Sequence, residues 1–384
     1  MFSRRTDWKL TPNRFTQAQQ EAHGREVLDL TLSNPTRAGF DYDQQAILRA
    51  FSNPAALDYD PQPKGLPIAR QAVAEYYRHR GKVNPESLVL TTSTSEGYSF
   101  VFRLLCNPED EVLVPKPSYP LFEFLADLQD VKLVPYPLLY DHGCQIDLAT
   151  LEKAVTPRTR AVVLVHPNNP TGSYVTKDER AALNRICREH NLAIIVDEVF
   201  LDYAQDGRLP ASFASNAEVL TFTLSGISKI SALPQLKLAW IAASGPADQL
   251  QLALSRLEII ADTFLSLNAP VQLAASTLID QRHSLQPQLL DRVRANLAEL
   301  DRQLAQQKAC QRLAVEGGWY AILRVPVTQS DEDLAIEILR KASVLVHPGH
   351  FYDFPRDGYL VLSLITPLSQ FQEGIDRLLR LLAV

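Results

Sequence analysis

Polar side chains that could do chemistry stand at the ends of several apolar runs of this sequence. Ser93-Thr94-Ser95 follows the run SLVLTT, Asp197 follows LAIIV, and the segment from Ser225 to Lys229 follows VLTFTL. The Ser/Thr cluster opens a predicted helix, where hydroxyls and backbone N–H groups can hold a phosphate. Lys229 adds an amine to the last of these segments.

Taken singly, each of these segments also has an ordinary structural interpretation. The Ser/Thr cluster can be a helix cap, Tyr119 a turn aromatic between prolines, PNNPTG a turn, Asp197 an N-cap and Lys229 a surface lysine. Their positions favour a joint function. In a parallel α/β sheet the carboxyl ends of the strands meet at one edge, and ligands bind there.

The elements that must position these residues lie between Ser87 and Ala243. Short β-branched runs, SLVLTT, EVLVP, VKLVPYP, RAVVLV, LAIIV, VLTFTL and KLAWIAA, alternate there with helical patterns. Continuous apolar runs of this length are typical of strands buried on both faces of a largely parallel sheet. The helix after RAVVLV has a capping box, Thr176 with Glu179, and is expected to end near Asn191.

The fold class predicted from this pattern is α/β, with a large domain whose mostly parallel sheet is flanked by helices, plus a smaller α+β domain. After Pro246 long helical patterns follow, including a polar, Gln-rich one from about Ser284 to Gln311, and then the short strands YAILRV, VLV and YLVLSL. We expect an N-terminal segment (1–44) that packs on the small domain or the site, a large domain (45–283) and a small C-terminal domain (284–384).

The chain resembles the fold-type I pyridoxal-phosphate (PLP) aminotransferases of class I/II over nearly its whole length. The matching pieces, in the family's order, are YDPQPKGLPIAR, TSTSEG, PKPSYP, HPNNPTG, IVDEVF, SGISK with LPQLK, and VLVHPG. The most specific spacing places Asp197 28 residues after Asn169, and Lys229 32 residues after Asp197.

The resemblance implies a role for each matching residue. Lys229 would form the Schiff base with PLP, Asp197 would keep the pyridine nitrogen protonated, Asn169 would bind the ring's O3′, and Tyr119 would stack on the ring. The implied phosphate ligands are Thr94, Ser95, Ser225, Ser228 and Lys237. In the family a tyrosine that matches Tyr59 reaches the phosphate from the neighbouring subunit, so the resemblance implies a homodimer with shared sites. Arg70, in the helix that follows, is a weaker candidate for that surface.

Three positions depart from the family pattern. Phe200 stands where a tyrosine usually donates to O3′, and Lys237 stands where an arginine usually forks onto the phosphate. Val361, in YLVLSL, stands where an arginine grips the substrate α-carboxylate. A charge-assisted hydrogen bond contributes on the order of 1.5–3 kcal/mol. Either Arg356, Arg37 or Lys64 replaces that arginine, or the substrate is not an ordinary α-amino acid and lacks a free α-carboxylate. We therefore expect weak activity with common amino acids, and improved activity when Val361 is changed to arginine and the neighbouring residues leave room.

Composition narrows the possible partners and location. The chain has 384 residues, 38 Lys plus Arg against 44 Asp plus Glu, and no long run of either charge, so nucleic acid and membrane surfaces are unlikely partners. The four cysteines are widely spaced, which suggests neither a metal site nor a disulfide framework. The first residues lack the apolar region of a signal peptide, and we expect a cytoplasmic protein.

The leading functional hypothesis is amino-group transfer between an amino donor and a 2-oxo acid or another carbonyl acceptor, through Lys229. A PLP-dependent lyase or decarboxylase on the same fold is the first alternative, because it would share Lys229 and Asp197. A non-catalytic PLP-binding or ligand-binding sensor is a second alternative, of another class. A nicotinamide dehydrogenase is disfavoured because no GxGxxG follows any strand.

Overall fold

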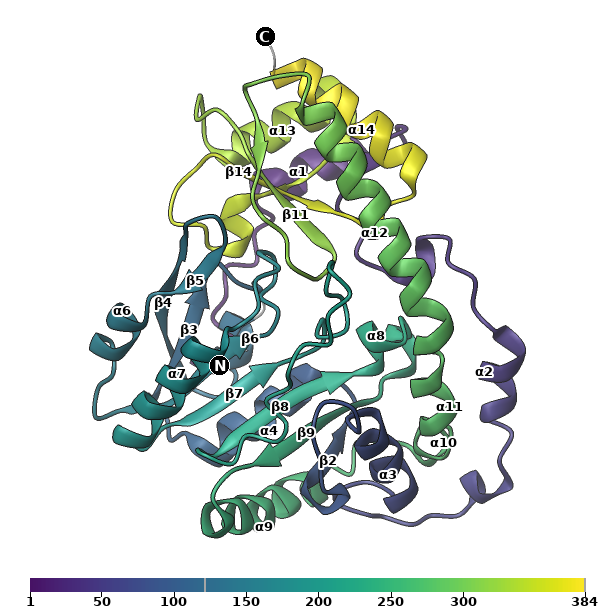
Figure 1. Ribbon diagram of the computed structural model, residues 1–384, viewed down its shortest axis with the longest axis vertical. Helices are drawn as coiled ribbons and strands as arrows, with labels where there is room; N and C mark the ends of the chain where they lie inside the picture. The colour runs from purple at the N-terminus through teal and green to yellow at the C-terminus, as the bar shows by residue number, and fades with distance from the viewer. Residues whose placement is uncertain (121, 383–384) are drawn as a thin grey trace.

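The computed structural model describes residues 1–120 and 122–382. Its largest element is an eight-stranded sheet in the lower half of Figure 1. In spatial order the strands are β2 (Leu88–Thr91), β9 (Ala239–Ser244), β8 (Thr221–Gly226), β7 (Ala193–Asp197), β6 (Thr159–Val165), β3 (Glu111–Lys116), β4 (Lys132–Tyr140) and β5 (Cys144–Ile146). The five strands from β8 to β4 are mutually parallel. Strand β9 runs antiparallel to both β2 and β8, and β5 runs antiparallel to β4, so six of the eight strands have one direction and the predicted mostly parallel sheet is confirmed.

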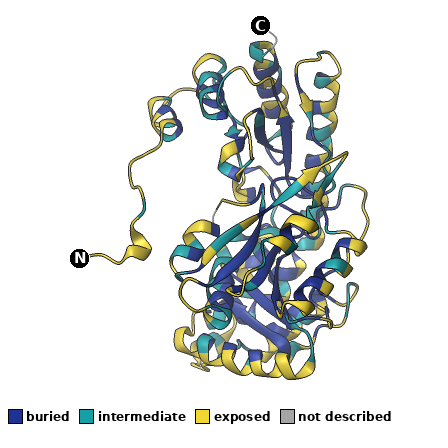
Figure 2. Cartoon of the chain, turned by 90° about the vertical axis from the view of Figure 1, so that its left-hand side faces the viewer, coloured by how far each residue is buried: buried dark blue, intermediate teal, exposed yellow. Residues whose placement is uncertain are grey.

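Helices cover both faces of this sheet. One face packs against α4 (Thr94–Leu105), α5 (Phe122–Asp127) and α9 (Ala247–Phe264). The other face packs against α3 (Pro67–Tyr76), α6 (Leu148–Lys153), α7 (Lys177–Glu189), α10 (Ala269–Leu273) and α11 (Ala275–Asp280). Successive strand residues alternate between these layers, so that Ile195 packs on the first and Ile194 on the second. Burial on both faces explains why the strands are continuous apolar runs, and they are dark blue in Figure 2.

The predicted capping box of the helix after β6 is confirmed. The Thr176 hydroxyl accepts a hydrogen bond from the Glu179 backbone N–H, and the Glu179 carboxylate accepts one from the Thr176 N–H. Helix α7 ends one residue before His190, and Asn191 then turns the chain through a left-handed conformation into β7.

The second layer of structure is a small antiparallel sheet above the large one in Figure 1. Its strands are β10 (Gln311–Arg312), β11 (Tyr320–Arg324), β14 (Tyr359–Ser363) and β13 (His347–Pro348), in that order. It is covered by α12 (Arg282–Leu304), α13 (Asp331–Ala342) and α14 (Leu368–Leu382). The polar helix predicted over residues 284–311 is therefore α12. The observed helix begins two residues earlier than predicted and ends seven residues earlier.

The N-terminal segment packs against this small sheet. Helix α1 (Arg14–Glu21), purple in Figure 1, lies beside α13, and β1 (Leu28–Asp29) pairs in parallel with β12 (Val344–Leu345). Phe15 and Leu30 are buried in the same core as Val361. The short α2 (Gln44–Ala50) follows on the other side of α12. The three-part division of the chain at residues 44 and 283 stays a prediction.

Candidate active site

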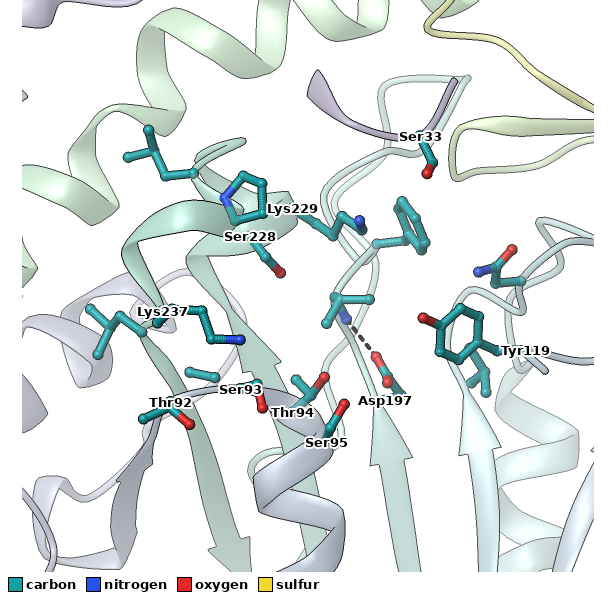
Figure 3. A pocket seen from close by; sticks show the side chains of 18 of the residues that line it. Ser33, Thr92, Ser93, Thr94, Ser95, Tyr119, Asp197, Ser228, Lys229 and Lys237 are labelled. Carbon is teal, nitrogen blue, oxygen red and sulfur yellow. Dashed lines mark hydrogen bonds between the residues drawn. The ribbon is translucent and has the colours of Figure 1, made fainter. Parts of the chain in front are cut away.

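A cavity of about 270 Å³ lies at the carboxyl edge of the large sheet, beneath the small domain. Eight of the predicted site residues line it: Thr94, Ser95, Tyr119, Asn169, Asp197, Ser228, Lys229 and Lys237. They come from six separate segments between residues 94 and 237, and Figure 3 shows most of them facing one space. The parallel strands bring these segments together, because β6, β7 and β8 all end at this edge.

The floor of the cavity carries Asp197, the last residue of β7. Its carboxylate accepts hydrogen bonds from the backbone N–H of Val199 at 3.1 Å, drawn as a dashed line in Figure 3, and from the Tyr98 hydroxyl at 3.4 Å. Burial raises the pKa of Asp197 to about 6, and these hydrogen bonds and the charge of Lys229 oppose that rise. A buried carboxylate with two donors and no adjacent arginine suits a cationic N–H group of a ligand.

Lys229 lies in α8 (Ile227–Ile230), the single helical turn that follows β8. Its Nζ atom lies 5.2 Å from the centre of the Trp319 ring and 5.7 Å from that of Phe200. Burial lowers the pKa of Lys229 to about 8, although the charge of Asp197 opposes the shift. A lysine near this pKa is partly neutral at physiological pH, and the neutral amine is the form that attacks carbonyls.

One end of the cavity has the properties of an anion site. Helix α4 begins there with Thr94 and Ser95, which line the cavity, so the positive end of the helix and the N–H groups of its first turn lie at this end. The side chain of Lys237 extends toward Ser93 and Thr94 in Figure 3. Lys237 has φ 53° and ψ 55°, a left-handed conformation that costs a lysine on the order of 1 kcal/mol.

Close packing sets the position of this helix. A Cβ atom at Gly97 would lie 3.0 Å from the Leu224 side chain in β8, so a larger residue would require Leu224 or α4 to shift. The glycine of TSTSEG therefore allows the first turn of α4 to pack closely on the sheet edge.

The cavity also fits PLP at the position of Asn169. The side-chain oxygen of Asn169 is buried and has no hydrogen-bond partner in residues 1–120 and 122–382. A buried amide oxygen without a hydrogen-bond partner is costly. A ligand N–H could donate to this oxygen, or, with the amide flipped, the Asn169 side-chain N–H could donate to a ligand oxygen. Tyr119, 39% exposed, forms the opposite side of the cavity. Together with Asp197, Lys229 and the α4 anion site, this set of groups matches a phosphorylated pyridine aldehyde.

Two predicted site residues lie outside the cavity of this chain. Ser225 is fully buried in β8, and its hydroxyl donates to the carbonyl of Glu198 at 3.4 Å. Strand pairing with Trp240 keeps it within the sheet, so a phosphate role for Ser225 has no support here. Tyr59 is 84% exposed and borders a surface groove instead. Phe200, which replaces the family's tyrosine, does line the cavity.

Several residues of the cavity were not predicted. Ser33, Thr92 and Tyr320 line it, and Tyr98 reaches Asp197 from α4. Thr92 belongs to the TSTSEG segment, whose position after a strand was the available signal, and Ser93 of the predicted Ser/Thr cluster also lines the cavity. Ser33 and Tyr320 lie 287 residues apart in the sequence, and no local pattern connects them to the strand ends.

The structure locates Val361 and the three cations that could replace the family's carboxylate-binding arginine. Val361 is fully buried in β14, opposite Ile322 in β11 and His347 in β13, within the core of the small domain. Val361 does not line the cavity and is covered by its neighbours, so the room on which improved activity with arginine at position 361 depends is not seen in this structure. Lys64 is engaged with Glu86, at 3.1 Å from Nζ to the carboxylate. Arg356 and Arg37 are exposed.

No group of His, Cys, Asp or Glu residues able to hold a metal ion is found among the described residues, and no helix in this part of the chain is long and apolar enough to cross a membrane.

Comparison with known proteins identifies the family. The model of the family "Aminotransferase class I and II" matches residues 27–378. The glutamate-pyruvate aminotransferase AlaA of Haemophilus influenzae is 27% identical over 373 residues, covering 94% of this chain and 92% of the relative. That of Escherichia coli K12 is 33% identical over 269 residues, 69% and 66% of the two chains.

A solved aminotransferase from Escherichia coli has the same fold, with a TM-score of 0.84 and 26% identity over 96% of this chain and 93% of that one. The family match covers nearly the whole chain, including every cavity segment. The protein therefore belongs to the class I and II aminotransferases of fold type I and is a PLP-dependent aminotransferase, as its sequence motifs predicted.

Proposed function

We propose that this enzyme transfers the amino group of an amino acid to a 2-oxo acid with PLP attached to Lys229. The observation that carries this assignment is the cavity in which a buried lysine with a lowered pKa, a buried carboxylate and a helix N-terminus converge. The side chain of Lys237 places a second amine in the same cavity. We do not assign PLP attachment to it, because it lies beside Ser93 and Thr94 at the anion end. The relatives' names make L-glutamate and L-alanine the first donors to test.

When bound, PLP supplies an electron sink for the carbanion that forms at the substrate Cα. The chain's own groups have three tasks around it. Asp197, which accepts hydrogen bonds from the Val199 N–H and the Tyr98 hydroxyl, would keep the proton on the ring nitrogen. Lys229 would act as the base toward the substrate Cα, because its lowered pKa makes it an effective base near neutral pH. Thr94, Ser95, Ser228 and Lys237 would hold the phosphate.

Reduction with borohydride followed by peptide mapping tests the attachment site. We expect the label on Lys229, and none in a Lys229→Ala protein. A label on Lys237, or a protein that takes up no PLP, would overturn the assignment. Incubation of the PLP form with a panel of amino donors then tests the reaction, because transfer changes the cofactor's absorption without added acceptor. Product release without this change would indicate the lyase alternative.

A homodimer with shared sites is the second part of the proposal. Tyr59 and Leu265 border one surface groove of about 170 Å³, and Leu57 and Ile259 expose large apolar side chains near it in sequence. Exposed apolar surface of this kind marks association sites. Mixing Tyr59→Phe subunits with Lys229→Ala subunits should restore activity through heterodimers with one intact site. A monomer by light scattering, or no restored activity, would contradict the shared site.

A cytoplasmic location stays a prediction. It is supported by the four cysteines, which are free in this structure, since disulfides are rare in reducing compartments.

A further inference from the structure

The cavity wall that faces away from the sheet carries hydroxyl groups. Ser33 reaches down from the N-terminal segment at the top of Figure 3, and Tyr320 comes from the start of β11. Among the described residues, the cations that line the cavity are Lys229 and Lys237. The first is assigned to the cofactor and the second lies at the anion end. An amino-acid substrate would therefore lack a cation for its carboxylate within this wall.

Strand register explains why β14 does not supply that cation. Directly opposite residues of antiparallel strands point to the same face, so Val361 and Ser363 lie on the same face as Tyr320 and Ile322. That face is the one that contributes Tyr320 to the cavity. Val361 is apolar and fully covered, so the strand that carries the arginine in the family presents no charge here.

The N-terminal segment covers this face and is held at both ends. Upstream of Ser33, the Ser363 N–H donates to the carbonyl of Leu30 at 2.7 Å, and the Ser363 hydroxyl donates to that of Leu32. Downstream, Arg292 of α12 donates to the carbonyl of Ala38 at 3.2 Å and to that of Ile365 at 3.3 Å. The backbone from Ser33 to Arg37 is therefore fixed beside the cavity.

A short 3₁₀ helix, η2 (Pro35–Arg37), occupies this fixed stretch. The Asn34 side chain caps it by accepting from the Thr36 N–H, and Pro35 and Ala38 are buried on either side of the turn. Arg37 is exposed, and its guanidinium makes no hydrogen bond or ion pair with any residue in 1–120 or 122–382. A free guanidinium four residues from a cavity hydroxyl, on an anchored turn, is available for a ligand anion.

The other candidate cations are less suitable. Lys64 donates to both the carboxylate and the carbonyl of Glu86 at 3.1 Å. Arg356 donates to the Tyr359 hydroxyl at 3.3 Å, on a loop from which no residue lines the cavity. Arg37 alone of the three combines a free guanidinium with a segment that contributes to the cavity wall.

We propose that Arg37, with the Ser33 hydroxyl, binds the carboxylate of the amino-acid substrate and so replaces the family's arginine on β14. This inference rests on the proposed function, since it assigns the substrate side of the same site. It makes α-amino acids with a free carboxylate the substrate class, and it places their recognition on the N-terminal segment instead of the small-domain sheet.

The test uses the PLP-loaded enzyme and a matched pair of donors. The best amino-acid donor from the panel is compared with its α-amide, in which a neutral group replaces the carboxylate. Loss of a charge-assisted hydrogen-bonded pair raises KM about tenfold or more, so we expect Arg37→Ala to raise KM for the acid by that factor while kcat changes less than about threefold. The kcat/KM for the amide should not change. Arg37→Lys should recover part of the loss, and Ser33→Ala should raise KM by a smaller factor.

Two control variants give the outcomes their meaning. Arg25→Ala removes another exposed arginine from the N-terminal part of the chain and should leave both donors unaffected. Arg356→Ala tests the rival cation and should do the same. An unchanged KM for the acid in Arg37→Ala, or a wild type that does not prefer the acid to its amide, would overturn the inference. Failure to load PLP, or a PLP-loaded wild type that uses no amino acid, would instead overturn the proposed function, and absorption of the bound cofactor separates the two cases.

Discussion

The two sides of the cavity differ in how their chemical groups are positioned. The sheet side takes Asp197, Lys229 and the start of α4 directly from strand ends, and each follows its strand within a few residues. The other side is assembled from the N-terminal segment and β11, whose residues Ser33 and Tyr320 meet only through the packing of the small domain. The groups that we propose for cofactor binding therefore lie on the large sheet, whereas those that we propose for substrate binding lie on a separately packed layer.

This difference indicates on which side of the cavity the substrate specificity can change without altering the cofactor site. A substitution at a strand end would alter the site that we propose for the cofactor. Position 361 lies instead in the core of the small domain, so valine in place of the family's arginine leaves the sheet side undisturbed. The predictions below test this division, beginning with the sheet side, where the effects on activity should be largest.

Removal of the Lys229 amine should have the largest effect. Lys229→Ala should lower kcat/KM by at least about a thousandfold, because both the covalent attachment and the base at Cα are lost. Single-turnover assays with the best donor measure this loss. The variant should still fold, since no hydrogen bond or ion pair of the Lys229 Nζ is found among the described residues and the side chain lines the cavity. A residual activity within tenfold of wild type would contradict the assignment of Lys229.

Asp197→Asn should lower activity by about 10²–10³-fold, because a neutral amide of the same shape cannot keep the ring nitrogen protonated. Its effect should also depend on pH. Burial raises the pKa of Asp197 to about 6 in the free chain, so the carboxylate is charged above that pH and protonated below it. PLP affinity in the wild type should therefore fall as the pH drops through about 6. Titration of cofactor binding should show no such fall in Asp197→Asn.

On the substrate side, Val361→Arg should destabilise the protein instead of improving it. An arginine at this fully buried position would leave an unpaired charge in the small-domain core, at a cost of about 3–5 kcal/mol in the free energy of unfolding. Chemical denaturation measures this cost, and Val361→Ile is the control, with an expected change within about 1.5 kcal/mol. Wild-type stability together with a higher kcat/KM for amino acids would show that position 361 opens to the cavity.

The smallest effect is expected from Phe200→Tyr. Phe200 lines the cavity, 5.7 Å from the Lys229 amine, and an added hydroxyl can donate to the anionic oxygen of the cofactor ring. The midpoint pH of the cofactor's absorption change should fall by about one unit, the size of a single charge-assisted hydrogen bond. Tyr203→Phe, which loses a hydroxyl that bonds the Lys229 carbonyl at 2.6 Å, separates this effect from general disturbance of the aromatic cluster. An unchanged midpoint in Phe200→Tyr would indicate that position 200 does not face the oxygen.

The sequence by itself determined the sheet side of this protein. Buried parallel strands need continuous apolar runs, and the chain must become polar where each run ends, so Asp197, Asn169 and the α4 start could be identified from local patterns. The spacing of the motifs indicated the family, and the resemblance to that family implied the roles of Lys229 and Tyr119. The helix cap at Thr176 was predictable for the same reason, because capping depends on residues only three positions apart.

Only the tertiary structure decided the substrate side. The covering of Val361 depends on the pairing of β14 with β11 and β13, and the approach of Ser33 to Tyr320 joins segments 287 residues apart in the sequence. Ser225 shows the same limit within a motif, because its pairing in β8 turns the hydroxyl toward Glu198 and away from the cavity. Local patterns encode which face of an element is buried, but the element that buries it is chosen by the packing of the whole chain.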